Sequence, residues 1–517
     1  MIRDLLQGIP SNKQADVVVV GAGAAGISLA VELARHGRQV ILLEGGGASL
    51  EESSQQLYRS DLPGLSHRGI HTGRFRVHGG TTTMWGGQIL ELDESDFAQR
   101  PWIPASGWPI PKSELLPHYA RALELEGIAG SILDDRRVWE TLGDPVPHFD
   151  GLDSYLSRWC PEPNFARLHR RSLEANPRID LWLHANAVEL LIEHDQATGV
   201  RCRTLSGTEA IFRARDYIFA LGTIESSRFF LQPRPQGVHP WNRSGLLGRH
   251  FQDHIDSDAA TVRSRSLAEV HRLFDGIFLR GYKYNPKLRL TLEVQRASGI
   301  LNAGGTIFSV SDLDTDLAEV KTTAKHILRG RLGQLSAAQL ARLLRNAPLV
   351  VRQAYRYGVQ HRAFHLPSAE IKLRVHCEQQ PDSESSITLS NERDSLGLLR
   401  TRLTWCISPT ELRTIRRFVE IAQTSFAGIA EIVPNPDLLA AGDRFKEHCQ
   451  DSFHHMGGMR MNSSPTAGVV DTDLKLHGIR NAYICSGAVF PTSGFSNPTH
   501  TLLALAVRLA ARLAAQN

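Results

Sequence analysis

The chain has 517 residues, of which 42% are hydrophobic, enough to bury the cores of two or three domains. Its formal net charge of +4 is too small by itself to indicate a nucleic-acid-binding protein. The six cysteines are scattered without a C-x-x-C pair, which argues against zinc and against a secreted disulfide framework. Residues 1–15 lack the apolar core of a signal peptide, and no apolar run is long enough to span a membrane. The sequence therefore predicts a cytoplasmic protein.

The first recognisable unit has the strand–turn–helix pattern that binds a dinucleotide. Val17–Val20 is a β-branched run typical of a strand buried on both faces, and Ala24–His36 has the periodicity of a helix. Three glycines have the G-x-G-x-x-G spacing. Gly21 permits a tight turn, Gly23 permits a close approach to a pyrophosphate, and Gly26 permits close packing of the helix on the strand.

The ends of this unit predict its ligand contacts. At Ala24 and Ala25 the helix begins, and its free N–H groups and partial positive charge face the phosphates. Glu44 ends the second strand, where a carboxylate accepts hydrogen bonds from ribose hydroxyls and repels the 2′-phosphate of NADP. The pattern does not separate FAD from NAD.

A glycine-rich stretch follows between His71 and Gly87. Its glycines surround three threonines and a tryptophan, and backbone of this kind lets main-chain N–H groups approach a ligand closely. A flexible surface loop is the alternative explanation.

These motifs resemble those of the glucose-methanol-choline (GMC) flavoprotein oxidoreductases. The stretch from Gly73-Arg74 to Gly79-Gly80-Thr81-Thr82 is similar to the flavin-contacting signature of that family, and Tyr217–Arg228 is similar to its second signature. The C-terminal motifs described below complete the match, while the middle of the chain matches only loosely. Gly79–Trp85 looks most like the pyranose-oxidase branch.

The resemblance implies FAD as the cofactor. Some family members attach flavin through a histidine in this loop, but Met84 stands at that place, and a thioether cannot supply the ring nitrogen; the resemblance therefore implies non-covalent FAD. The positions that it assigns to FAD outside the first unit are Arg74, Gly79, Gly80, Thr81, Thr82, Met84, Val188, Gly487, Ala488 and Pro498. Many members carry an aspartate where this chain has Ser486.

The C-terminal region holds the residues for alcohol chemistry. Oxidising an alcohol requires a base for the hydroxyl proton, and histidine has a pKa near neutrality. His454 and His455 are adjacent, and an ordinary buried pair or a metal site would also account for them. The family pattern His-x-x-Gly-x-x-Arg-Met, counted back from Arg460, selects His454 as the base, with His455 as the second choice.

The second expected active-site residue is Asn497. Its amide can orient the substrate oxygen as charge develops. Asn497 is also a good N-cap, with Pro498 at the first position of a predicted helix over 499–514. The positive end of that helix would favour negative charge on a reduced flavin.

The predicted fold is α/β, with a Rossmann-like FAD-binding domain built from discontinuous segments and an α+β substrate domain. The FAD-binding domain takes residues 1–100, 170–255 and 445–517, and residues 101–169 form a connector with helices. Residues 256–444 form the substrate domain, with an antiparallel sheet that includes strand-like runs at Ile277–Arg280 and Leu288–Val294, and with a helical insertion at about 316–357.

The basic excess of the chain lies in that insertion. Residues 321–369 contain nine lysines and arginines and no acid, and subtracting nine from +4 leaves −5 for the rest. A solvated helical hairpin explains this composition, and so does an amphipathic face for an anionic membrane surface or an oligomer contact. The positions are Lys321, Lys325, Arg329, Arg331, Arg342, Arg345, Arg352, Arg356 and Arg362.

The sequence as a whole predicts an FAD-dependent oxidoreductase that oxidises a secondary or primary alcohol, on a sugar or glycoside, by hydride transfer to flavin N5. Oxygen or a quinone-like acceptor would reoxidise the flavin. An NAD-dependent dehydrogenase and a membrane-peripheral flavoprotein with a lipid-linked substrate remain as alternatives.

Overall fold

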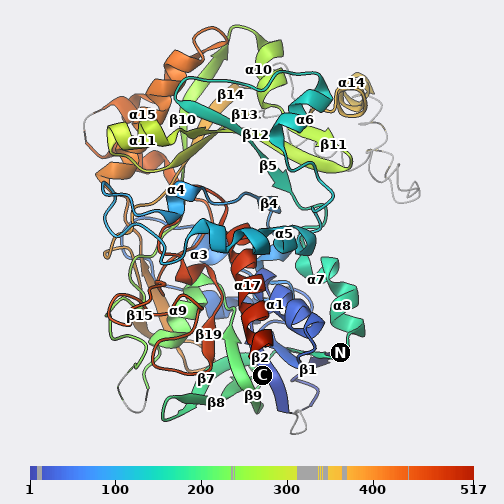
Figure 1. Ribbon diagram of the computed structural model, residues 1–517, viewed down its shortest axis with the longest axis vertical. Helices are drawn as coiled ribbons and strands as arrows, with labels where there is room; N and C mark the ends of the chain where they lie inside the picture. The colour runs from blue at the N-terminus through green and yellow to red at the C-terminus, as the bar shows by residue number, and fades with distance from the viewer. Residues whose placement is uncertain are drawn as a thin grey trace.

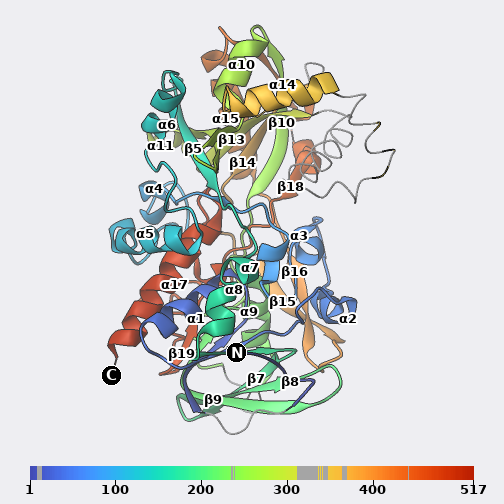
Figure 2. The ribbon, with the colours of Figure 1, turned by 90° about the vertical axis from the view of Figure 1, so that its right-hand side faces the viewer.

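Two sheets organise the chain, one in each of two lobes (Figures 1 and 2). The computed structural model describes residues 1–8, 14–234, 237, 239–310, 336, 338, 341, 347–363, 370–440 and 442–516. The N- and C-termini both lie in the lobe of the first sheet (Figure 2).

The first sheet has the order β1-β6-β3-β2-β9-β8-β7, and β19 pairs with β9. The strands β1, β6, β3, β2, β9 and β19 run parallel to one another. The strands β7, β8 and β9 form an antiparallel ribbon. The strands are β1 (Ile2–Asp4), β2 (Gln14–Val20), β3 (Val40–Leu43), β6 (Ile179–Leu183), β7 (Asn186–Glu193), β8 (Gln196–Arg203), β9 (Glu209–Phe219) and β19 (Ala482–Ile484). Val17–Val20 is fully buried, as a β-branched run in a covered parallel strand should be.

Helices from both ends of the chain cover this sheet. α1 (Ala24–Arg35) packs against α17 (Pro498–Ala515), which also packs against α5 (Leu116–Leu125). α9 (Thr223–Leu231) follows β9 directly, so the parallel sheet and its helices come from segments far apart in the sequence.

The second sheet is antiparallel, with the order β17-β10-β14-β13-β12-β5-β4; β11 pairs with β12, and β18 with β10. Its strands are β4 (Gln88–Ile89), β5 (Leu152–Trp159), β10 (Ile255–Ser264), β11 (Ile277–Leu279), β12 (Tyr282–Leu290), β13 (Ala303–Val310), β14 (Glu370–Cys377), β17 (Ala430–Pro434) and β18 (Cys449–Asp451). The connector expected at 101–169 therefore supplies a strand, β5, to this sheet.

The second sheet has one apolar and one polar face. In β14, buried Ile371, Leu373 and Val375 alternate with Lys372 and Arg374, the period-two pattern of a half-buried strand. α15 (Pro409–Ser425) packs on β10, β13 and β14. The polar face carries part of the site described below.

The remaining elements complete the two lobes. They are α2 (Glu52–Gln55), α3 (Gly69–Thr72), α4 (Glu94–Phe97), α6 (Asp135–Leu142), α7 (Phe165–Leu168), α8 (Arg170–Ala175), α10 (Leu267–Phe274), α11 (Leu292–Ser298), α14 (Ala347–Gly358) and α16 (Pro436–Leu439), with the hairpin β15 (Ser386–Arg393) and β16 (Leu399–Thr404) and short 3₁₀ turns.

The α/β fold class is confirmed, but one expected strand is wrong. The run Leu288–Val294 was expected to be a strand, yet β12 ends at Leu290 and α11 begins at Leu292. The Thr291 side chain accepts a hydrogen bond from the N–H of Val294, so this threonine caps a helix and ends the strand.

The basic insertion is described only in part. α14 lies within the predicted helical range, whereas 316–329 and six of the nine basic positions lie outside the described residues. Of the other three, Arg356 pairs with Asp275, and Arg362 pairs with Asp144 at 2.5 Å. These two charges are therefore directed at acids of the same lobe.

Candidate active site

The glycine turn between β2 and α1 has a shape that only glycine permits. Gly21 has φ 103°, and a Cβ there would lie 2.5 Å from the Ala220 carbonyl oxygen. A Cβ on Gly26 would lie 1.8 Å from the carbonyl oxygen of Gly21, so α1 packs directly on the turn. Gly23 faces open space, and the first turn of α1 carries no acidic residue. The turn thus leaves backbone N–H groups and the helix N-terminus free for an anion.

Glu44 lies beside this turn. Its carboxylate oxygens accept hydrogen bonds from the N–H groups of Ala22, at 3.0 Å, and Gly46, at 2.8 Å. Burial raises the pKa of Glu44, and these backbone donors act in the opposite direction. The donors fix the orientation of the carboxylate at the edge of the cavity.

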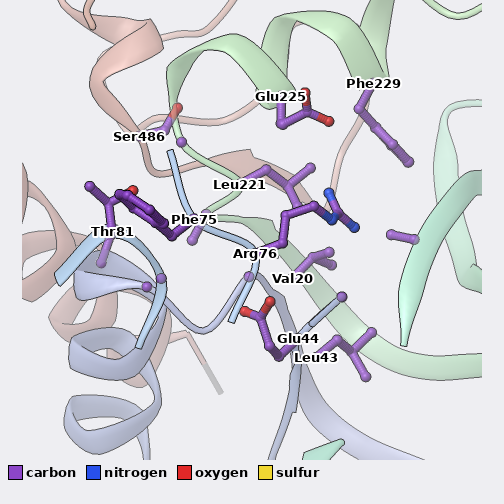
Figure 3. Close-up of a pocket in the computed structure, with 18 of the residues that line it drawn as sticks. Val20, Leu43, Glu44, Phe75, Arg76, Thr81, Leu221, Glu225, Phe229 and Ser486 are labelled. Atoms are coloured by element: carbon purple, nitrogen blue, oxygen red, sulfur yellow. The ribbon is translucent and has the colours of Figure 1, made fainter. Parts of the chain in front are cut away.

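Figure 3 shows the cavity that this turn and Glu44 line, with Arg76, Phe75 and Thr81 on its walls. It brings together these predicted cofactor residues: Gly21, Gly23, Ala24, Ala25, Glu44, Gly80, Thr81 and Thr82. Regions far apart in the chain meet here, among them the glycine turn, the glycine-rich loop, the start of α9 and the start of α17. A cradle of bare glycine backbone beside a fixed carboxylate fits an adenine dinucleotide such as FAD.

The other predicted cofactor residues do not line this cavity. Gly487, Pro498 and Val188 lie next in sequence to the lining residues Ser486, Thr499 and Ala187, and Ala488 lies two positions after Ser486. Gly26 and Gly79 shape the turn and the loop. The Arg74 side chain pairs with Glu225 at 3.0 Å and donates to the Ile70 carbonyl oxygen. The Met84 side chain is 65% exposed.

Sequence reasoning missed a charged network along the cavity wall. Arg228 pairs with Asp394 at 2.5 Å and with Glu225 at 3.1 Å. Arg76 donates to the side-chain oxygen of Asn186 at 2.6 Å. Glu225 and Arg228 lie within the second resembling motif, so their i,i+3 spacing was a signal; Asp394 joins them from a distant hairpin.

A second chamber contains both predicted catalytic residues, His454 and Asn497. The side-chain nitrogens His454 Nε2 and Asn497 Nδ2 lie 2.9 Å apart. Gln88 donates to Asn497 Oδ1 at 3.1 Å, which leaves Asn497 Nδ2 as the donor to His454. Asn497 is the N-cap residue of α17 and Pro498 begins the helix, as predicted, but the Asn497 side chain makes no cap hydrogen bond, because Gln88 and His454 engage its amide.

The hydrogen bonds define the proton positions on His454. Because Nε2 accepts from Asn497, the proton lies on Nδ1, which is 2.9 Å from Nδ1 of His254 and donates to it. Burial lowers the pKa of His254 to about 4. Burial, and next the neighbouring His254 ring, hold the pKa of His454 well below its usual range. Both rings are therefore neutral near pH 7, and His454 Nε2 carries an available lone pair.

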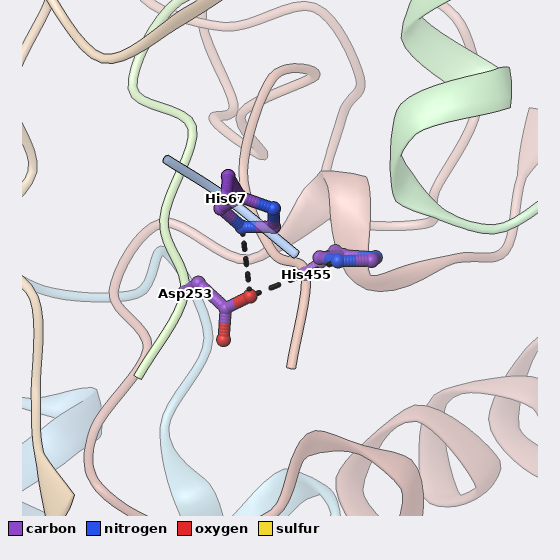
Figure 4. Close-up of side chains that lie close together, drawn as sticks. All are labelled: His67, Asp253 and His455. Carbon is purple, nitrogen blue, oxygen red and sulfur yellow. Dashed lines mark hydrogen bonds and ion pairs between the residues drawn. The ribbon is translucent and has the colours of Figure 1, made fainter. Parts of the chain in front are cut away.

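His455 faces a different environment (Figure 4). Its Nε2 lies 3.7 Å from Asp253 Oδ2, which is 3.1 Å from His67 Nε2. These three side chains have the composition of a metal site, but His67 Nδ1 accepts the N–H of Ile70 at 3.2 Å. His67 Nε2 therefore bears a proton and donates it to Asp253, so the ring cannot offer that lone pair to a metal.

Asp253 instead anchors the loop that carries His454. Its second oxygen, Oδ1, accepts the backbone N–H groups of His454 at 2.9 Å and of Ser452 at 3.3 Å. His500, at the start of α17, pairs with buried Glu126 at 2.8 Å and is absent from the chamber lining.

One wall of the chamber comes from the polar face of the second sheet. Asp256 of β10 and His376 of β14 lie opposite each other, with Oδ1 and Nδ1 2.5 Å apart. Lys287 of β12 lies opposite Tyr155 of β5, and all four residues line the chamber. Burial alone would raise the pKa of Asp256, but the neighbouring His376 lowers it well below its usual range. Strand alternation was the only sequence signal for these residues.

Two parts of the chain match known protein families. Residues 16–236 match the family described as FAD dependent oxidoreductase, and residues 381–506 match GMC oxidoreductase. Paromamine 6'-oxidase from Streptomyces fradiae is 23% identical, covering 96% of this chain and 91% of that protein. 2-Methyl-1,2-propanediol dehydrogenase from Mycolicibacterium austroafricanum is also 23% identical, over 96% and 95%.

Solved structures share the fold. The structure titled as pyridoxine 4-oxidase from Mesorbium loti has a TM-score of 0.58 at 16% identity, covering 96% of this chain and 99% of that one. A structure of formate oxidase has a TM-score of 0.59 at 17% identity, over 98% and 99%.

The nucleotide cradle and these matches define a flavoprotein oxidoreductase. The chain combines an FAD-dependent oxidoreductase domain with a GMC oxidoreductase C-terminal domain, as an FAD-dependent oxidoreductase of CH–OH donors. The matched family is FAD-dependent, so the NAD-dependent alternative loses its basis. Among the described residues, no helix is both long and apolar enough to cross a bilayer.

Proposed function

We propose that the enzyme oxidises a primary or secondary alcohol of a sugar or glycoside, with His454 as the base and Asn497 as the group that orients the substrate oxygen. The observation that carries this proposal is the acceptor nitrogen of His454, Nε2, whose only partner among the described residues is the amide donor of Asn497, 2.9 Å away in the same chamber. The sugar assignment is supported by the resemblance of the glycine-rich loop to sugar oxidases, and one relative is named as a paromamine oxidase.

The two side chains divide the work on the substrate hydroxyl. The hydroxyl enters between them, donates to His454 Nε2 and accepts from Asn497 Nδ2 in place of their mutual hydrogen bond. FAD, when bound, supplies the hydride acceptor for the carbinol carbon. As the hydride leaves, the hydroxyl proton moves to His454 Nε2, and the ring becomes a cation.

The neighbours of His454 prepare the ring for this transfer. His254 Nδ1 accepts the proton on His454 Nδ1 and so holds the tautomer that presents Nε2. Asp256 raises the pKa of His454 and so stabilises the cation once it forms, whereas burial keeps the resting ring neutral.

The decisive experiment is anaerobic flavin reduction by a panel of sugars. His454→Ala should retain bound flavin and reduce it at least about 100-fold more slowly, because positioned general-base catalysis contributes roughly 10²–10⁴-fold. His148→Ala, at a side chain 90% exposed, is the matched control and should behave like the native enzyme. Near-native reduction by His454→Ala would refute the base assignment.

We also propose that FAD is bound without a covalent bond. Met84 stands at the family's attachment position, its thioether cannot form the histidyl link, and its side chain is 65% exposed. Acid precipitation of the yellow enzyme should release all flavin into the supernatant, whereas colour that stays in the pellet would show a covalent link.

The electron acceptor is proposed to be oxygen or a quinone-like compound. The relatives include proteins named as oxidases and as dehydrogenases. Mixing the reduced enzyme with oxygen, and separately with a benzoquinone, gives two reoxidation rates, and the faster one identifies the acceptor class.

A further inference from the structure

Lys287 is a buried cation, and no carboxylate of the described residues contacts it directly. Its residue surface is 8% exposed, and it lines the same chamber as His454 and Asn497. Within the described part of the chain, no hydrogen bond or ion pair reaches its Nζ atom, although Asp256 acts on it electrostatically from beyond ion-pair distance.

The neighbouring carboxylate is already engaged. Asp256 Oδ1 lies 2.5 Å from His376 Nδ1, and His376 Nε2 lies 3.3 Å from the Thr306 hydroxyl. A buried charge is unfavourable unless it is paired and hydrogen-bonded, and an ammonium has three donors to satisfy. Among the described residues the chamber therefore offers a cation with no partner in direct contact, which a bound anion could supply.

The sheet places this cation on the same wall of the chamber as His376 and Asp256. Lys287 lies on β12 opposite Tyr155 of β5, and Arg289 two residues on lies opposite Gly304 of β13. Gly304 also lies opposite His376, so Lys287, His376 and Asp256 share one face of one sheet. His454 and Asn497 line the same chamber, so a molecule bound in it has Lys287, His454 and Asn497 within one cavity.

We propose that the substrate carries a carboxylate that binds Lys287 while its hydroxyl lies between His454 and Asn497, which makes it a hydroxy acid or a sugar acid. This inference rests on the proposed function, because it places the oxidised carbon at His454. A singly charged group suits one ammonium, whereas a phosphate dianion would bring excess charge close to Asp256.

The first test compares substrates that differ in this one group. The pairs are glucuronate and glucose, gluconate and glucitol, and glycerate and glycerol, each mixed anaerobically with the holoenzyme. The carboxylate member should reduce the flavin with the higher kcat/KM. Lys287→Met should lower that value about 30-fold or more, the loss typical of removing one partner of a buried charge pair, and should leave the neutral member within about 3-fold.

Lys372→Met is the matched control. Lys372 lies on the polar face of β14 and pairs with Glu370 at 3.3 Å, and it does not line the chamber. This variant should keep the native preference, and Lys287→Arg should keep part of it. Equal losses for both members of a pair in Lys287→Met would overturn the proposal, because the charge would then serve the reaction and not the recognition of substrate. Faster reduction by the neutral members would also overturn it.

A second measurement needs no turnover. Acetate and acetamide are titrated into the holoenzyme while the visible flavin spectrum is followed. Acetate should bind more tightly than acetamide to the native enzyme, and this difference should disappear in Lys287→Met. Equal binding of the two probes by the native enzyme refutes the carboxylate site. Selective acetate binding together with no flavin reduction by any pair would instead count against the proposed alcohol oxidation.

Discussion

At the scale of single residues, the reaction depends on which nitrogen of His454 holds its proton, and His254 sets that choice. Replacing His254 by Phe removes the acceptor of the Nδ1 proton and also the ring that lowers the pKa of His454. We expect flavin reduction to slow by about 10-fold as the tautomer is lost. The acid limb of the rate profile should also move to higher pH, which a loss of folding alone would not cause. An unchanged acid limb would contradict this role.

The charge of Lys287 should make acetate binding depend on pH in the basic range. Burial lowers the pKa of Lys287 to about 8, so the cation is present below that pH and lost above it. The charged or titratable groups that face it are Asp256, His376, His254, His454 and Tyr155. Acetate binding should weaken about 10-fold for each pH unit above 8, whereas acetamide binding should not change. Acetate affinity that stays constant to pH 10 would contradict the prediction.

At the scale of elements, the packing of α1 on the glycine turn decides whether the cofactor cradle forms. Gly26→Ala would place a Cβ 1.8 Å from the Gly21 carbonyl oxygen, which is backbone and cannot rotate away. The helix must shift, at a loss of about 1–3 kcal/mol in stability and with loss of flavin. The ratio of flavin to protein absorbance in the purified variant measures this. Gly428→Ala, where no atom lies within 4 Å of the added Cβ, should keep full flavin content.

Within the elements, local motifs could be predicted from the sequence, whereas contacts between distant segments could not. The β2–α1 unit is local, so Gly21, Gly26 and Glu44 could be placed from spacing alone. Thr291 was misread because a β-branched residue suits a strand as well as an N-cap, and only the hydrogen bond to Val294 distinguishes the two. Asn497 has the sequence preference of a capping side chain, but Gln88 engages its amide from more than 400 residues away.

At the scale of the whole molecule, the active chamber is a product of chain topology. The chamber wall combines β5, β10, β12 and β14, and His454 reaches it from a loop near the C-terminus. Cross-strand register brings Asp256 beside His376, 120 residues later in the chain. No local pattern contains that pairing, which is why Asp256, His376 and Lys287 could not be predicted as site residues.

This assembly buries several neutral histidines at the junction of the two lobes, and stability should therefore fall in acid. Burial lowers the pKa values of His254, His454 and His455 in the folded protein, while the unfolded chain keeps values near 6.5. Below pH 6.5 the unfolded state binds the additional protons, so unfolding becomes more favourable as pH falls toward 4. Each such histidine removes about 2 kcal/mol of stability by pH 5.

Thermal melts of the holoenzyme at pH 7.5 and pH 5.0 measure this loss. His455→Phe keeps a ring beside His67 and Phe251 but cannot take up a proton, and His455 is absent from the chamber lining. The variant should therefore lose less of its Tm between the two pH values than the native enzyme, whereas His148→Ala, at an exposed histidine, should lose as much. Equal losses in the native enzyme and His455→Phe would show that folding does not lower the pKa of His455, because protonation is coupled to unfolding only where the folded and unfolded pKa values differ.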